Sequence, residues 1–294
     1  MSRYILFILG LGILITTSCT NEKEKEKKID SFDVSVEGTK TNDFDLMFSA
    51  PSPVEIFSLF EDSELKFNSN LLSNPKNFEE KTSLSSLNTS LGVYMADVAY
   101  LNIFNQFELM TSYLDGIFYI ADKLNLSGIY NQFDFKKVFS DMNNPDSLEL
   151  LSNNLFVTIT NYMTETDNEK TLCIVYYSSY IELLYLVFNS IDEFDGNLPI
   201  IQHITLQSSS LNDLYKFSNK FSDDEDIKVM REDLSKINKV WGECEVVKSE
   251  TNTSETENGE LSIGGGNTLK LTESQFLQLK TTISELRGKI IEQH

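Results

Sequence analysis

Two acidic residues inside apolar stretches of the sequence are the first candidates for chemistry. Asp97 lies within residues 91–100 and Glu182 within residues 178–185. Because an unpaired buried carboxylate is costly, each must find a hydrogen-bond partner, a metal ion or water, or keep a proton. One hypothesis is a shared polar site in the core, completed by Tyr94, Tyr100, Tyr180, Tyr185 and His203. The alternative, which we favour, is that each carboxylate is satisfied locally by a hydroxyl or a helix N-terminus, or reaches solvent.

The sequence has none of the spacing patterns that mark common catalytic or metal sites. It contains no GxSxG, HExxH or CxxC motif and no Glu-x-x-His pair of the kind that builds di-metal bundles. His203 is more typical of a structural histidine than of a catalytic base, and Gly264-Gly265-Gly266 is not followed by the GK[ST] of a phosphate loop. The sequence therefore predicts no catalytic residue, no metal ion and no cofactor.

Apolar spacing predicts that these residues are carried by an all-α fold, an antiparallel multi-helix bundle, over residues 47–294. The strongest helical segment is 87–124, with a possible break near Gly116. Residues 172–188 are apolar almost all round, which predicts a central buried helix, with a strand over 172–177 as the alternative. Thr166 and Glu169 predict a capping box before that helix. Capping and proline signals, together with apolar spacing, predict further helices starting near Ser52, Phe133, Asn144, Ser210, Ser222 and Thr272.

Two features interrupt the helical pattern. Residues 248–267 are rich in Ser, Thr, Asn and Glu, which predicts a flexible acidic loop within the helical domain. Cys173 lies in an apolar run and Cys244 in a more polar one. A buried free thiol is the simple expectation for Cys173, and a Cys173–Cys244 disulfide remains an alternative that only geometry can decide.

The N-terminus has the layout of a secretory signal. Arg3 precedes an apolar run that ends in small polar residues before Cys19. Because a membrane-spanning helix needs about 20 apolar residues, this shorter run predicts a cleaved signal peptide over residues 1–18. Residues 15–19 resemble a relaxed bacterial lipobox, which implies lipidation of Cys19, although Thr16 departs from the usual leucine. Residues 19–46 then predict a flexible charged tether.

The net charge restricts the partners. A formal charge of −21, with no compact basic patch, excludes nucleic acid. The sequence after Cys19 resembles that of exported lipoproteins, which indicates a lipid anchor in the outer membrane, on either its periplasmic or its cell-surface face. Residues 92–100 and 180–185 also resemble paired helical motifs of uncharacterised lipoproteins of Bacteroidota. That resemblance implies a mostly helical lipoprotein and no particular activity.

Three functional hypotheses follow. The favoured one is a non-enzymatic, membrane-anchored helical module that binds an envelope protein or a small ligand. The second is an envelope hydrolase or metal-dependent enzyme that uses Asp97 and Glu182, with help from His203. The third is a structural surface protein, which would self-associate and have no pocket. Convergence of the two carboxylates on an open cavity would favour the enzyme, and separate, locally satisfied carboxylates would favour the binding module.

Overall fold

The computed structural model describes residues 65–131, 145–255 and 261–292. All of these residues belong to one unit that spans residues 39–294. The predictions for the signal peptide, Cys19, the tether and the helices expected near Ser52 and Phe133 lie outside the described residues.

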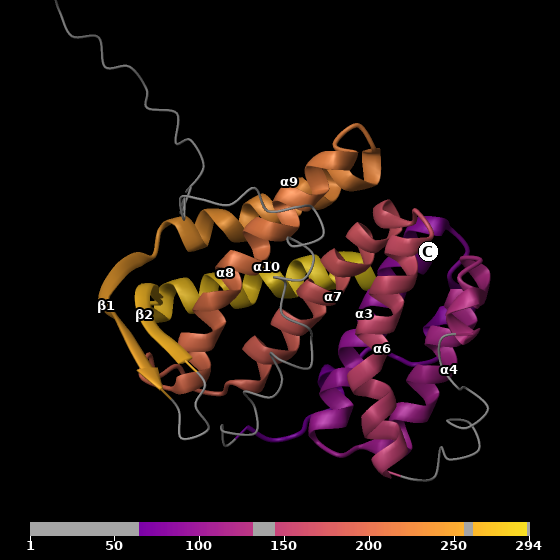
Figure 1. Cartoon of the computed structure of the whole chain (residues 1–294), viewed down its shortest axis with the longest axis horizontal. Helices are drawn as coiled ribbons and strands as arrows, with labels where there is room; N and C mark the ends of the chain where they lie inside the picture. Colours follow the sequence, from indigo (N-terminus) through magenta and orange to yellow (C-terminus); the bar gives the residue numbers. More distant parts are fainter. Residues whose placement is uncertain (1–64, 132–144, 256–260, 293–294) are drawn as a thin grey trace, which may run out of the picture. The chain divides into compact units, whose positions relative to one another are not determined.

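Seven α-helices of the described residues pack against one another, which confirms the predicted all-α bundle (Figure 1). They are α3 (Leu84–Ile103), α4 (Phe107–Lys123), α6 (Pro145–Glu165), α7 (Glu169–Ser190), α8 (Pro199–Phe217), α9 (Glu225–Gly242) and α10 (Glu273–Ile291). Four short 3₁₀ helices accompany them: η1 (Ser69–Leu71), η2 (Asn77–Glu80), η3 (Ser127–Asn131) and η4 (Ser218–Phe221).

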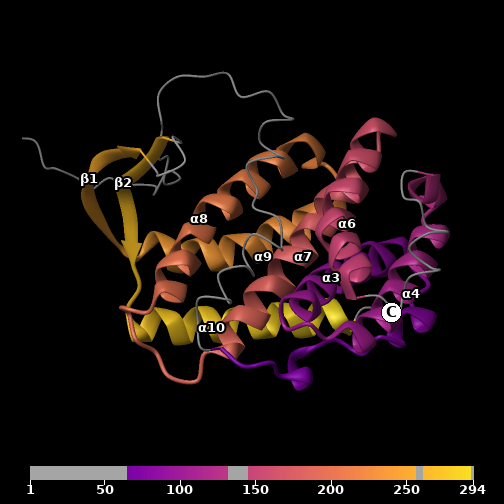
Figure 2. The same ribbon diagram turned by 60° about the horizontal axis from the view of Figure 1, so that its bottom comes forward.

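Helix α7 is the centre of the bundle. It contacts α3, α6, α8, α9 and α10 (Figure 2). Among the described residues it is the one helix long and apolar enough to cross a membrane, and 83% of that apolar window is buried inside the protein. Its composition is therefore that of a core helix surrounded by other helices. The helix extends through residues 172–177, so the strand considered there is wrong.

The predicted long helix over 87–124 is instead two helices, α3 and α4. The break falls at residues 104–106, where Asn105 has a φ of 55°. Asparagine tolerates this left-handed conformation better than most residues, and it ends helix α3. Gly116, where the sequence suggests a break, lies inside α4 and is buried. A Cβ at that position would press on the rings of Phe78 and Tyr94, so the glycine serves close packing.

Two of the predicted helix starts are confirmed. Pro145 is the first residue of α6, as expected from its fixed φ. Thr272 caps α10 and forms a capping box with Gln275, in which each side chain bonds the other residue's backbone.

The helices predicted near Thr166 and Ser222 are α7 and α9, but their N-caps are Asn168 and Asp224, and the start predicted at Ser210 is wrong. The Thr166 hydroxyl donates back to the Tyr162 carbonyl at the end of α6, and α7 begins only after Asn168. Helix α8 runs through Ser210 without interruption, and the Ser210 side chain is buried in the packed face of the helix. The N-cap of α9 is Asp224, whose carboxylate accepts two backbone N–H bonds of the first turn.

The prediction of a flexible loop over 248–267 is wrong. Strands β1 (Glu245–Glu255) and β2 (Leu261–Lys270) form an antiparallel hairpin there. The register shifts between Ser249 and Asn252. Strand β2 contacts α8, and the hairpin lies at the opposite end of the bundle from α4 in both views (Figures 1 and 2). The disulfide alternative is also excluded, because Cys173 and Cys244 are both free, buried thiols.

Candidate functional site

The two acidic residues singled out in the sequence do converge. Asp97 from α3 and Glu182 from α7 are both completely buried, with 0% of their surface exposed. The two helices pack closely because Gly92 of α3 lies directly against Val175 and Ser178 of α7. The two carboxyl groups interact electrostatically, so they form one buried polar cluster rather than two independent sites.

Glu182 is neutralised by an arginine from the last helix. Arg287 of α10 makes a bidentate pair with it, in which Nε donates to Oε2 at 3.0 Å and a terminal nitrogen donates to Oε1 at 3.1 Å. The guanidinium also donates to the carbonyl oxygen of Leu71 at 3.2 Å and stacks on the ring of Tyr185, 4.4 Å from its centre. Such a planar, forked geometry is the strongest form of a protein ion pair.

Asp97 is held by the segment that precedes α3. The backbone N–H of Ser73 donates to Asp97 Oδ2 at 3.3 Å, and the Ser73 hydroxyl donates to the same oxygen. The carbonyl oxygen of Ser73 accepts a bond of 2.6 Å from the hydroxyl of Tyr113 on α4. Asp97 therefore joins the segment before α3 to the centre of the bundle.

The remaining oxygen of Asp97 indicates where a proton resides. Within the described residues no group donates a hydrogen bond to Asp97 Oδ1, yet the Asp97 side chain lies within hydrogen-bonding reach of Glu182. Two carboxyl groups can form a hydrogen bond only if one of them carries a proton. Since Glu182 has the arginine as a counterion, we infer that Asp97 keeps the proton and donates it to Glu182.

The electrostatics agree with this assignment. Burial and the charge of Glu182 raise the pKa of Asp97 well above its ordinary value of 3.8, and the hydrogen bonds from Ser73 offset this only in part. Burial also raises the pKa of Glu182, but Arg287 and the hydrogen bond with Asp97 oppose that rise. Burial disfavours the charge of Arg287 as well, yet the two carboxyl groups keep its pKa above the ordinary value. One arginine thus neutralises one of the two acids.

The predicted aromatic partners divide into two groups. The hydroxyl of Tyr94 donates to the carbonyl of Asn74 at 2.9 Å, and that of Tyr100 accepts the backbone N–H of Asn68 at 3.1 Å. Both side chains, like Tyr185 beneath the arginine, belong to the surroundings of the cluster.

Tyr180 and His203 do not join them. Tyr180 donates to the carbonyl of Gln207 on α8, and His203 is partly exposed on that same helix. In the part of the chain that the structure describes, no hydrogen bond or ion pair connects either residue to Asp97 or Glu182. The described contacts therefore do not bring these two residues into the cluster.

A second buried aspartate shows the opposite electrostatic setting. Asp233 of α9 is 2% exposed, accepts hydrogen bonds from Lys236 at 2.8 Å and Lys289 at 2.6 Å, and also accepts one from the hydroxyl of Tyr177. Burial opposes its charge, but the two lysines outweigh that effect and hold its pKa below the ordinary value. The pKa is thus lowered at Asp233 and raised at Asp97, although both lie inside the bundle.

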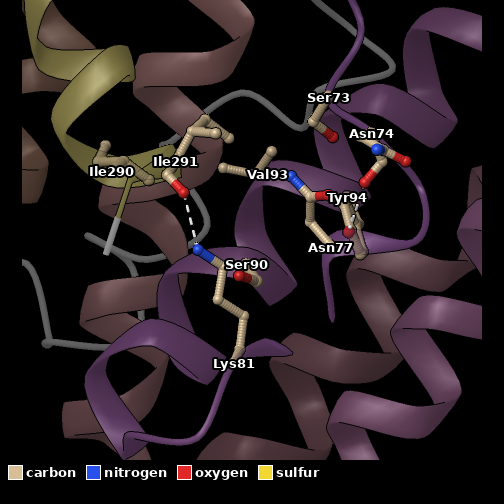
Figure 3. A pocket seen from close by; sticks show the side chains of 9 residues that line it. All are labelled: Ser73, Asn74, Asn77, Lys81, Ser90, Val93, Tyr94, Ile290 and Ile291. Atoms are coloured by element: carbon tan, nitrogen blue, oxygen red, sulfur yellow. Dashed lines mark hydrogen bonds between the residues drawn. The ribbon is translucent and has the colours of Figure 1, made fainter. Parts of the chain in front are cut away.

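A small pocket opens beside the cluster. Figure 3 shows it between the segment before α3, helix α3 and the end of α10, with the Lys81 amine directed at the carbonyl oxygen of Ile291, 2.7 Å away. Its volume of about 10 Å³ is room for roughly one water molecule. Ser73 lines this pocket and also bonds Asp97, whereas Asp97 and Glu182 do not line it.

The arrangement holds no ready metal site. In residues 65–131, 145–255 and 261–292, no three side chains of His, Cys, Asp or Glu are grouped as metal ligands. The carboxyl groups of the cluster are instead committed to a serine, an arginine and each other.

Sequence reasoning missed Arg287 and Ser73. A signal for the arginine did exist, because it lies four residues after Ile283 and three before Ile290, next to the apolar face of α10. Ser73 stands in a polar, loop-like stretch that gives no such signal.

Comparison with known proteins adds no further constraint, since no family model, curated protein or solved structure matches this chain.

Proposed function

We propose that this protein is a lipid-anchored helical module of the outer membrane that binds an envelope protein or a small ligand through its outer surface and catalyses no reaction. One observation carries this proposal: the two acids that the sequence analysis identified as candidates for chemistry have no access to solvent. Asp97 and Glu182 are both fully buried and are bonded by Ser73 and Arg287. The cluster thus stabilises the fold, and recognition is left to the surface.

The hydrolase alternative needs a carboxylate that touches substrate. General acid–base catalysis requires the acid or base to lie within hydrogen-bond reach of the reacting group, directly or through one water molecule. The adjoining pocket is far smaller than the clefts that usually bind small molecules, which have volumes of roughly 300–1,000 Å³. The closed cluster therefore supports the binding module over the enzyme.

Exposed apolar side chains offer positions from which to find the binding surface. Three of the most exposed are Leu84 on α3, Leu206 on α8 and Leu277 on α10, with 70%, 50% and 53% of their surface exposed. Single exposed leucines are common and do not identify a partner by themselves. They are useful because a photoreactive residue placed at each samples a different helix without disturbing the core.

The test examines the lipid anchor and the binding surface together, in the native envelope. A photoreactive residue at Leu84, Leu206 or Leu277 is expected to give a discrete adduct from one helix, and Asp97→Asn is expected to leave that adduct unchanged. Cys19→Ser should abolish incorporation of a fatty-acid label, release the protein from membranes and reduce the adduct. Cys173→Ser should keep the label, because this thiol is buried and plays no part in anchoring.

Three results would contradict the proposal. Continued acylation of the Cys19→Ser variant would contradict attachment of the lipid at Cys19. The absence of an adduct from all three positions would argue against a binding surface on those helices. Turnover of a substrate by the purified protein that is lost in a folded Asp97→Asn variant would favour the enzyme instead, since the substitution keeps the shape of the side chain and removes its acid chemistry.

A further inference from the structure

The segment Asn68–Lys81, here called the strap, is fastened to the bundle mainly by side chains. It contains only the short helices η1 and η2. Side chains of α3, α4 and α10 bond its backbone: Tyr100 at Asn68, Arg287 at Leu71, Asp97 and Tyr113 at Ser73, and Tyr94 at Asn74. At its far end Lys81 bonds the carbonyl of Ile291 (Figure 3).

Two contacts of the strap involve a titratable group: Asp97 at its middle, and the Lys81 amine at its far end, where burial lowers the pKa of the amine from 10.5. Ser73 gives both its N–H and its hydroxyl to Asp97, and its carbonyl to Tyr113. Tyr94 donates to the carbonyl of Asn74, and Tyr100 accepts from the N–H of Asn68. These groups stay neutral at ordinary pH, so the two bonds do not change with protonation. Asp97 is different because its proton lies between two buried carboxyl groups that share one arginine.

The strap also connects Asp97 to the pocket. Ser73 lines this water-sized pocket, and its hydroxyl donates to Asp97 Oδ2. A hydroxyl can accept a hydrogen bond from water while it donates one to a carboxyl group. Ser73 is therefore the residue of the strap that contacts both the pocket and the buried acid.

We propose that the strap is a proton-controlled latch, docked while Asp97 carries its proton and released from the bundle when Asp97 and Glu182 are both ionised. In the docked state the cluster holds one negative and one positive charge. Loss of the proton leaves a second, unbalanced negative charge in a dry interior, which water can relieve only if the strap lifts. Neither a lipid anchor nor a binding partner is needed for this device.

The charged and titratable groups around Asp97 come from each helix that faces it. Glu182 of α7 opposes its ionisation, Arg287 of α10 favours it, and the phenols of Tyr113 on α4 and of Tyr94 and Tyr100 on α3 are neutral neighbours. Burial raises the pKa of all three phenols, so they stay protonated through the neutral range. Asp97 is therefore the member of this group whose titration controls the strap.

The sign of the effect follows from linkage. A group with a raised pKa in the closed state binds its proton more tightly when closed, so opening becomes more favourable as pH rises. Between the ordinary pKa of 3.8 and the raised one, the opening equilibrium should increase by up to about tenfold per pH unit, and it should level off above the raised value.

Hydrogen–deuterium exchange of the full chain between pH 5 and 9, corrected for intrinsic exchange rates, tests the latch. The amide of Ser73 reports directly, because it donates to Asp97. We expect protection of strap peptides to fall with pH by up to about tenfold per unit. Peptides from Leu183 to Phe188 in α7 should keep their protection, since most side chains of that part of the helix are buried in the core. This comparison needs no variant.

Two variants separate the latch from other causes. In Asp97→Asn the amide can still accept from Ser73 and donate to Glu182, so strap protection should become independent of pH. In Asp233→Asn, a substitution of the other buried aspartate, the pH dependence of the strap should remain as in the unmodified protein. The latch is wrong if strap protection does not change with pH, if it falls together with that of α7, or if Asp97→Asn retains the full dependence.

Discussion

Substitution of Arg287 by methionine is expected to lower the free energy of unfolding by about 3–5 kcal/mol, because it leaves the Glu182 carboxylate buried without a counterion. The arginine makes a bidentate pair with Glu182 and bonds the carbonyl of Leu71, so its loss also removes a connection to the strap. Methionine fills much of the same volume, which limits the contribution of an empty cavity. The loss of stability should therefore reflect mainly the unpaired charge of Glu182.

Urea unfolding at neutral pH would measure this loss, and a second substitution would identify its cause. Glu182→Gln added to Arg287→Met should recover a large part of the stability, since a neutral amide needs no counterion and its carbonyl can still accept the proton of Asp97. Lys239→Met is the matched control. Lys239 is exposed on α9, so its substitution should change stability by less than about 0.5 kcal/mol. A loss below about 1 kcal/mol for Arg287→Met would contradict the buried ion pair.

Gly92→Ala is expected to destabilise the protein by at least about 2 kcal/mol, although alanine favours helices over glycine by about 1 kcal/mol. A Cβ at this position would overlap the hydroxyl of Ser178 and the backbone carbonyl of Val175, and it would lie 2.9 Å from the backbone nitrogen of Ser179. Backbone atoms of a central helix cannot move aside easily. The α3–α7 contact that brings Asp97 to Glu182 would therefore have to open.

Gly288→Ala provides the matched control for that prediction. Gly288 lies within α10, and a Cβ there would meet nothing within 4 Å. This substitution should leave stability unchanged or raise it by up to about 1 kcal/mol, measured by the same urea unfolding. Equal effects of the two substitutions would show that close packing at Gly92 is not what joins the two helices.

Much of the helical fold could be predicted because local signals coincide with the elements. Pro145 and the capping box of Thr272 mark real helix starts, and the apolar character of residues 172–188 identifies the central helix. The division of α3 from α4 could not be predicted, since it depends on one residue, Asn105, in a left-handed conformation.

The hairpin was missed for a different reason. Each half of residues 245–270 has a loop-like composition, and the strands exist through pairing between residues such as Val246 and Leu269. Pairing of this kind links distant positions and leaves only a weak local signal.

The candidate site shows the same division between local and distant information. Two acids in apolar helices predict that the acids need partners, and the structure joins them in one cluster. The identity of the partners depends on the tertiary fold, because Arg287 is 105 residues from Glu182 and Ser73 is 24 residues from Asp97. Tyr180 and His203 carry suitable chemistry but bond or lie elsewhere, so residue type alone overestimates the site.

The protonation state of Asp97 tests the central claim most directly, because a closed structural cluster with one arginine has to keep one of its two acids neutral. The ¹³C shift of the Asp97 carboxyl carbon, assigned by comparison with Asp97→Asn, can be followed through a pH titration of the folded protein. The account predicts that Asp97 titrates well above 3.8 and that Glu182 loses its proton at a lower pH than Asp97 does. An Asp97 that titrates near its ordinary pKa of 3.8 would contradict the shared proton, and with it the closed cluster and the latch.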